Sequence, residues 1–134
     1  MSQEDVSVVL AFHAAYNARE IDAAVDSCAV DVNAVPDATL FPESCVLVGR
    51  EKFRDFLNET WSAWSTSRDT PKEVLDIGDG RVLVRADWDG TGSASGVETH
   101  TNLSQIYTVT GGQVARAEYF FDHQKALEAV GLEA

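Results

Sequence analysis

Residues 97–121 read VETHTNLSQIYTVTGGQVARAEYFF, and this stretch decides the fold class. Val97 to Thr110 is rich in Thr, Val, Ile and Tyr, which strands favour, and Gln113 to Phe121 continues the same character. The pair Gly111-Gly112 between them is typical of a tight hairpin turn. The stretch therefore predicts two neighbouring antiparallel strands, the first of them long.

A second hairpin is predicted immediately before this one. Gly78-Asp79-Gly80 is a turn signal between an expected strand over residues 73–77 and another over residues 81–89. The pair Thr70-Pro71 predicts a break before the first of these strands. Residues 89–96 are rich in Gly and Ser, which favours a flexible loop or a bulged edge.

Helices are predicted before the strands and after them. Apolar residues recur at intervals of three and four from Ser2 to Asn17, from Ile21 to near Val30, and from Arg50 to Trp64. At the other end of the chain, Asp122 is placed to cap a short last helix that Gly131 stops. The order of helices first and antiparallel strands afterwards predicts an α+β fold, with helices packed on one side of a curved sheet.

The segment from Val32 to Val48 cannot be a single helix, because it contains Pro36 and Pro42. The apolar residues on either side of the prolines favour a short strand, an irregular excursion and a second strand from Cys45 to Val48.

Length and charge narrow the class of protein. The 134 residues fit one domain spanning residues 1–134, and the 45% hydrophobic content is enough for a folded core. Ten Lys and Arg against 22 Asp and Glu give a net charge of −12, which disfavours nucleic acid and anionic membranes as partners. No export signal or spanning segment is visible, so we expect a cytoplasmic protein with Cys28 and Cys45 unpaired.

Four short segments resemble the SnoaL-like branch of the NTF2-like superfamily, which has the cystatin-like fold. They are residues 12–25, 48–53, 77–84 and 112–122, in the family's order and at its separations. The resemblance implies a cone of three N-terminal helices on a strongly curved, mixed, mostly antiparallel sheet, with homodimers formed through the sheet's outer face. Members include polyketide cyclases, ketosteroid isomerases, epoxide hydrolases, dehydratases and binding domains without chemistry, so the fold alone does not give the function.

Arg85 and Asp87 are two residues apart on one predicted strand, so their side chains share a face and could hold each other in place. The pair is similar to the Arg-x-Asp of members related to limonene epoxide hydrolase. That resemblance implies acid–base work on an epoxide and makes Glu118, on the last strand, the candidate second carboxylate. The alternative interpretation is a salt bridge near the surface that contributes little.

Asp37 follows Pro36, where members related to ketosteroid isomerase place their general base. A carboxylate in an apolar cone would have a raised pKa suited to moving a proton next to a carbonyl. That family also has a Tyr on the first helix, and Tyr16 lies one turn beyond the matching position. The alternative is a solvated turn residue.

Four further residues are candidate ligand-binding walls, each with core packing as the alternative: His13, Tyr16, Trp61 and Tyr119. The His residues show no ligand-like spacing with Cys or carboxylates, and no phosphate-binding loop is present, so we expect neither a metal nor another cofactor. Two hypotheses stay open. One is an isomerase, cyclase or hydrolase acting on an apolar carbonyl or epoxide compound, and the other is a non-catalytic domain that binds a small apolar molecule or dimerises.

Overall fold

The structure is a computed structural model that describes residues 2–36 and 46–132. Asp37 and Cys45 lie outside the described residues, so the roles predicted for them stay predictions. The elements, in chain order, are α1 (Ser2–Asn17), α2 (Ile21–Asp26), β1 (Cys28–Val35), β2 (Leu47–Val48), α3 (Arg50–Ala63), β3 (Trp64–Gly78), β4 (Arg81–Gly92), β5 (Glu98–Thr110), β6 (Gln113–Phe120) and α4 (His123–Ala129).

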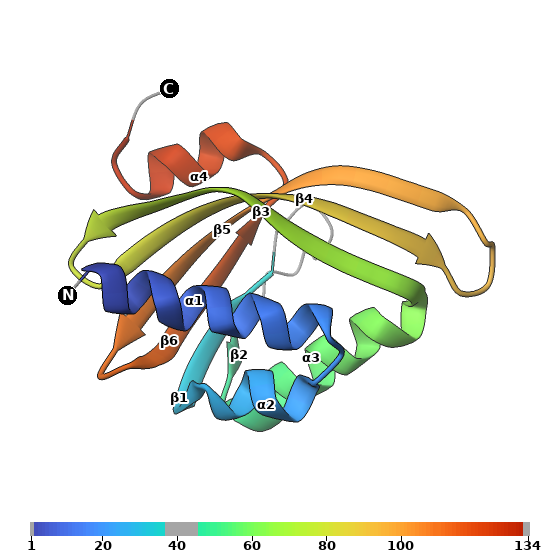
Figure 1. Cartoon of the computed structure of the whole chain (residues 1–134), viewed down its shortest axis with the longest axis horizontal. Coiled ribbons are helices and arrows are strands. Elements are labelled where there is room, and N and C mark those ends of the chain that lie inside the picture. Colours follow the sequence, from blue (N-terminus) through green and yellow to red (C-terminus); the bar gives the residue numbers. More distant parts are fainter. Residues whose placement is uncertain (1, 37–45, 133–134) are drawn as a thin grey trace.

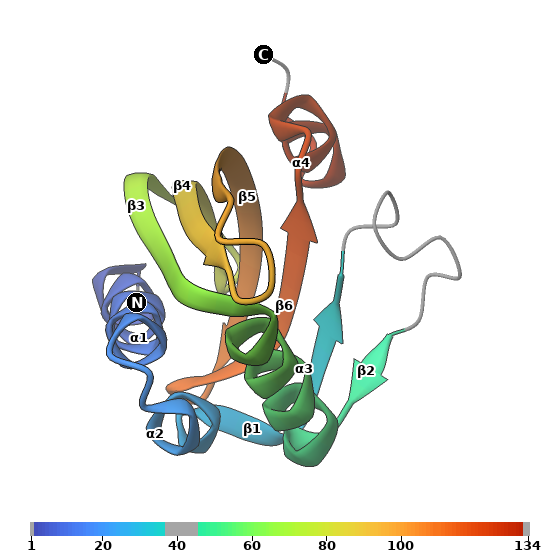
Figure 2. The same ribbon diagram turned by 90° about the vertical axis from the view of Figure 1, so that its right-hand side faces the viewer.

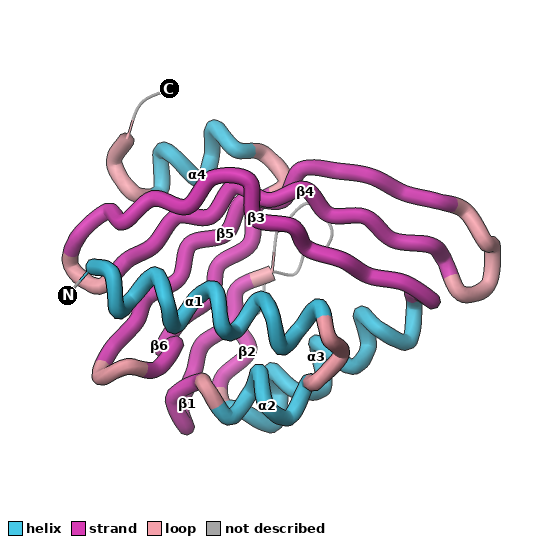
Figure 3. Tube along the Cα trace, viewed as in Figure 1, coloured by secondary structure: helices cyan, strands magenta, loops and turns pink. Residues whose placement is uncertain are grey.

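The strands form one six-stranded sheet in the order β2-β1-β6-β5-β4-β3 (Figure 1). β1 and β6 are parallel, and every other neighbouring pair is antiparallel. This arrangement confirms the predicted α+β class with a mixed, mostly antiparallel sheet. In the tube view, β3 begins at the end of α3, and β4 and β5 project beyond that point (Figure 3).

Helices cover both faces of the sheet. α1 packs against β3, β4, β5 and β6 over the inner face, where Val82, Val84 and Tyr107 are buried with residues of α1, α2 and α3. α4 covers part of the outer face, where Leu83 and Ile106 pack against Ala126 and Val130 (Figure 2). Successive residues of these strands point to opposite faces of the sheet, and apolar residues are buried on both faces.

Both predicted hairpins are confirmed at their turns. The chain reverses between Gly78 and Arg81 and again between Thr110 and Gln113. Gly80 has a φ of +76°, and a Cβ atom there would lie 2.6 Å from the carbonyl oxygen of Val109. Glycine is therefore required at this turn by both conformation and space.

The predicted break at Thr70-Pro71 is wrong, because both residues lie inside β3. The N–H and C=O of Asp69 hydrogen-bond to the side chain of Asn17 on α1, so they point away from β4. Pro71 is two residues further along, and its nitrogen faces the same free edge, where no N–H is needed. The position of β3 at the edge of the sheet therefore lets the strand continue through a proline.

Other element ends differ from the expected ones. The second helix ends at Asp26, not near Val30, and Cys28 already begins β1. Arg50 at the start of α3 donates to the Cys28 carbonyl from Nη2 at 2.6 Å and from Nε at 3.0 Å, which ties this early strand to α3. Trp64 begins β3 instead of ending α3, and β4 extends to Gly92. None of the described helices is long and apolar enough to span a membrane.

Candidate functional site

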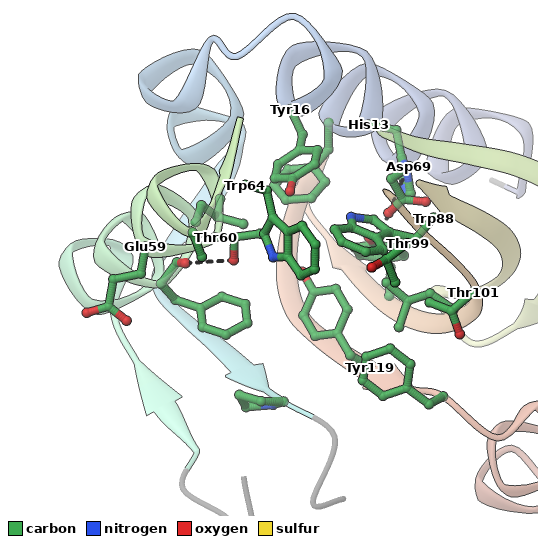
Figure 4. Close-up of a pocket in the computed structure, with 18 residues that line it drawn as sticks. His13, Tyr16, Glu59, Thr60, Trp64, Asp69, Trp88, Thr99, Thr101 and Tyr119 are labelled. Atoms are coloured by element: carbon green, nitrogen blue, oxygen red, sulfur yellow. Dashed lines mark hydrogen bonds and ion pairs between the residues drawn. The ribbon is translucent and has the colours of Figure 1, made fainter. Parts of the chain in front are cut away.

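A cavity of about 560 Å³ lies between the inner face of the sheet, α1 and α3 (Figure 4). This volume is within the range of small-molecule sites. The lining residues are mostly aromatic and aliphatic, with a few polar groups: Phe12, His13, Tyr16, Pro36, Phe56, Leu57, Glu59, Thr60, Ala63, Trp64, Asp69, Trp88, Thr99, Thr101, Leu103, Tyr107, Tyr119 and Phe121.

Aromatic rings form most of the cavity wall. The rings of Trp64 and Trp88 meet edge to face, with centroids 4.7 Å apart and an angle of 79° between their planes. Phe56 packs beside Tyr119 with centroids 6.1 Å apart. Such walls favour a flat apolar ligand, because the faces and edges of the rings can pack against a flat ligand and bury a large apolar area.

Asp69 is the buried carboxylate of the cavity wall, with 6% of its surface exposed. Its Oδ2 accepts a hydrogen bond from the Gln105 side-chain amide. Its Oδ1 is buried and has no hydrogen-bond partner among the described residues. Burial raises the pKa of Asp69, because a charged carboxylate in an apolar wall loses its hydration.

His13 on α1 faces the same carboxylate. Its Nδ1 lies 3.7 Å from Asp69 Oδ2, and its Nε2 lies 3.0 Å from the Tyr107 hydroxyl. That hydroxyl donates its proton to Gln105 Oε1, so it accepts from His13 and Nε2 carries a hydrogen. Burial lowers the pKa of His13, and the charge of Asp69 opposes the shift only in part. Nδ1 is therefore the nitrogen that can exchange a proton with the carboxylate.

A second polar group lies on the same wall. Ser67 Oγ is 2.6 Å from the Tyr16 hydroxyl and accepts from Trp88 Nε1 at 3.0 Å. When Ser67 in turn donates to the Tyr16 oxygen, the Tyr16 proton is left to donate into the cavity. Burial raises the pKa of Tyr16, which keeps it in the protonated form that can donate.

The structure places three of the four predicted wall residues in the cavity: His13, Tyr16 and Tyr119. Trp61 lies behind them, with its ring centroid 5.7 Å from that of Tyr16. The Arg19 guanidinium covers Trp61 from the other side at 5.0 Å. Trp61 therefore supports the wall from behind instead of lining it.

The predicted catalytic residues on strands lie on the other face of the sheet. Val84, Ala86 and Trp88 point to the core or the cavity, so Arg85 and Asp87, which alternate with them, point outward. Asp87 Oδ2 forms its ion pair with Lys72 Nζ at 3.8 Å, in place of the expected pairing with Arg85.

Glu118 also lies on the outer face of the sheet. It is paired in register with Ile106, whose side chain packs under α4, and its carboxylate binds the neighbouring Arg116. It is therefore not brought together with the cavity carboxylate.

Sequence reasoning missed the polar residues in the cavity wall and directly behind it: Ser67, Asp69, Trp88, Gln105 and Tyr107. The available signal was the spacing of two between Ser67 and Asp69 and between Gln105 and Tyr107, which puts each pair on one strand face. The first pair was hidden by the assumption that the strand begins only after Thr70-Pro71. Within residues 2–36 and 46–132, no group of three or more His, Cys, Asp or Glu side chains could hold a metal ion.

Comparison with known proteins gives the family. The model of the SnoaL-like domain matches residues 9–117. The solved structure of TerC, co-crystallised with polyporic acid, is similar with 20% identity and a TM-score of 0.77, over 95% of this chain and 98% of that one. A SnoaL-like polyketide-cyclase-type protein from Jannaschia has 15% identity and a TM-score of 0.79, over 99% and 95%.

A protein of the ketosteroid isomerase-like fold from Catenulispora acidiphila, in complex with trimethylamine, has 16% identity and a TM-score of 0.75, over 93% and 92%. No curated protein matches the sequence. Because the family model covers most of the chain and the fold agrees with these structures, the chain belongs to the SnoaL-like domain family.

Proposed function

We propose that the protein is a cofactor-independent acid–base catalyst of the isomerase or cyclase type, acting on an apolar aromatic carbonyl compound. The observation that carries the proposal is Asp69, a buried carboxylate on an aromatic cavity wall with one oxygen that no described residue binds. A carboxylate with a raised pKa is suited to taking a proton from carbon next to a carbonyl.

The proposed step uses groups already in place. Asp69 removes a proton from the carbon beside the carbonyl. The electron pair of that C–H bond forms a carbon–carbon double bond, the π pair of the carbonyl moves to its oxygen, and an enol or enolate forms. Tyr16 donates a hydrogen bond to this oxygen. Return of the proton from Asp69 to another carbon completes an isomerisation. In a ring closure, the enolate carbon instead attacks a second carbonyl of the same molecule, and the proton on Asp69 passes to the oxygen of that carbonyl.

His13 and Gln105 lie next to the Asp69 carboxylate and position it. His13 Nδ1 lies 3.7 Å from the carboxylate, and the Gln105 amide fixes the orientation of Asp69 Oδ2. Both side chains are buried, which holds them in one arrangement around the carboxylate. The expected effect of such a positioned base is on the order of 10² to 10⁴ in rate.

Proton exchange tests the reaction without the natural substrate. Two- to four-ring ketones such as 2-tetralone are first screened for binding by thermal shift, and the bound compounds are incubated in D2O. Loss of the NMR signal of the hydrogens next to the carbonyl measures exchange. We expect faster exchange than in buffer for the wild type, and the buffer rate for Asp69→Asn.

Asp87→Asn is the matched control, because it makes the same change on the outer face of the sheet. It should exchange at the wild-type rate. Equal rates for wild type and Asp69→Asn would overturn the proposal, whereas loss of exchange in Asp87→Asn would favour the epoxide-hydrolase-like interpretation of the sequence.

The second candidate is a domain that binds a small molecule without a reaction. It is favoured by the outward positions of Arg85 and Asp87, which leave the cavity without the Arg-x-Asp pair of epoxide hydrolases. Ligand binding without exchange in the same experiment would support it. Homodimerisation through the outer sheet face and a cytoplasmic location stay predictions.

A further inference from the structure

Among the described residues, the cavity wall contains acidic side chains and no permanent positive charge. The chain has ten Lys and Arg residues, all within the described ranges, and none of them lines the cavity. The acids that the described part of the chain places on the wall are the buried Asp69 and the exposed Glu59 of α3. His13 is the remaining ionisable nitrogen there, and burial favours its neutral form.

Several of the basic side chains have partners outside the cavity. Lys72 pairs with Asp87 on the outer face of the sheet, and Arg54 Nε binds Asp22 Oδ1 at 2.9 Å between α3 and α2. Arg19 covers Trp61 on the side away from the cavity wall. A negatively charged ligand in the cavity would therefore lose its hydration beside Asp69 without gaining a cationic partner, which is costly in an apolar surrounding.

A positively charged ligand meets the opposite situation. The faces and edges of Tyr16, Trp64, Trp88 and Tyr119 surround the space, and aromatic faces attract ammonium groups. Asp69 supplies a carboxylate whose Oδ1 no described residue binds. Without a ligand, the apolar wall disfavours the ionised form of this carboxylate. An ammonium group beside it would stabilise that form.

We propose that the cavity ranks ligands of equal shape by their charge: it binds an aromatic ammonium ion more tightly than the uncharged analogue, and it excludes the carboxylate. The ligand class that fits is therefore an aromatic compound with a basic nitrogen, and Asp69 is its counter-ion. This inference shares the cavity with the proposed function but does not depend on a reaction.

Isothermal titration calorimetry at neutral pH tests the ranking with three probes of one shape: 2-naphthylmethylammonium, 2-naphthylmethanol and 2-naphthoate. We expect the ammonium ion to bind about tenfold more tightly than the alcohol, the size of a desolvated cation–aromatic contact with a counter-ion. We expect no binding of 2-naphthoate at millimolar concentration. Absence of binding by the ammonium ion, or binding of 2-naphthoate as tight as that of the alcohol, overturns the proposal.

Variants locate the source of the preference. In Asp69→Asn the ammonium ion and the alcohol should bind within about twofold of each other, while retained binding of the alcohol shows that the cavity persists. Glu51→Gln makes the same change of charge on α3 at an exposed residue outside the cavity, and the wild-type preference should remain. A tenfold preference that survives in Asp69→Asn contradicts the assignment of the counter-ion.

The outcome is separable from that of the proposed reaction. The ranking is measured at equilibrium and without turnover, whereas the reaction is measured by hydrogen exchange. A chain that ranks the three probes as expected but exchanges no hydrogen would lose the proposed function and keep this inference.

Discussion

Asn17 hydrogen-bonds to both main-chain groups of Asp69: its Nδ2 donates to the Asp69 carbonyl at 2.8 Å, and its Oδ1 accepts from the Asp69 N–H at 2.9 Å. One side chain of α1 thus replaces a neighbouring strand at the edge of the sheet. It also fixes the backbone from which the cavity carboxylate projects.

We expect Asn17→Ala to lower the free energy of unfolding by about 2 kcal/mol, because two partly buried main-chain groups lose their partners. Urea unfolding followed by circular dichroism measures the change. Asn58→Ala, on the exposed side of α3, is the control and should change stability by less than about 0.5 kcal/mol. A loss no larger in Asn17→Ala than in this control would show that the contact does not hold β3.

Ser67 is shared by two partners, so its removal affects both. Ser67→Ala leaves the Tyr16 hydroxyl and Trp88 Nε1 without this hydrogen-bond partner, and we expect a loss of about 1 to 3 kcal/mol in the free energy of unfolding. Ser65→Ala changes the same residue type two positions earlier on β3, where the side chain is exposed. Equal unfolding curves for the two variants would contradict a stabilising role of the Ser67 contacts.

The pH dependence of stability separates His13 from Asp69. Burial lowers the pKa of His13 from 6.5, so the unfolded chain takes up this proton first, and the wild type loses stability as the pH falls below that value. His13→Gln lacks this loss. We therefore expect the stability of His13→Gln relative to wild type to increase as the pH falls from about 7 to about 5. Urea unfolding at each pH measures this difference.

Asp69 should show the opposite slope. Burial raises its pKa from 3.8, so its contribution is fully present below that pH and is lost as the pH rises through the folded value. Asp69→Asn should therefore gain stability relative to wild type as the pH rises from about 4. Parallel pH profiles for wild type and both variants would mean that neither side chain titrates differently in the folded protein.

The N-terminus of α4 depends on one side chain. Asp122 accepts from the Gln124 N–H at 2.9 Å, and α4 covers Leu83 and Ile106 on the outer face. We expect Asp122→Ala to cost about 1 kcal/mol and Asp122→Asn to cost much less, since Asn also caps helices. Thermal unfolding gives both values, and an Asn variant as unstable as the Ala variant would argue against capping as the cause.

The architecture was predictable because its turns are marked in the sequence. Gly111-Gly112 and the Gly78 to Gly80 segment determine two hairpins, and the spacing of apolar residues determines α1 and α3. The end of α2 was not predictable from periodicity, because Cys28 and its neighbours are apolar enough for either helix or strand. Their strand state follows from pairing with β6, a contact distant in sequence.

Which face of β4 lines the cavity was also not predictable, because it depends on a contact between residues that are distant in the sequence. Alternation places Arg85 and Asp87 together, and this is confirmed, but it does not say which face is the inner one. Leu83 on their face is buried by α4, so apolar residues occur on both sides of the strand. The assignment of faces needed the position of α4, so the sequence could not show that Asp87 points away from the cavity.

Pro71 also affects what the sheet can join. β3 is an edge strand of 15 residues, and a free edge of that length invites a strand from another molecule. Pro71 offers no donor there, Asn17 already occupies the groups of Asp69, and the charged Lys72 follows. Edge-to-edge pairing of β3 with a strand of another copy would build a continuous intermolecular sheet, which is the route to fibrous aggregates. These features obstruct that pairing along this side of the molecule.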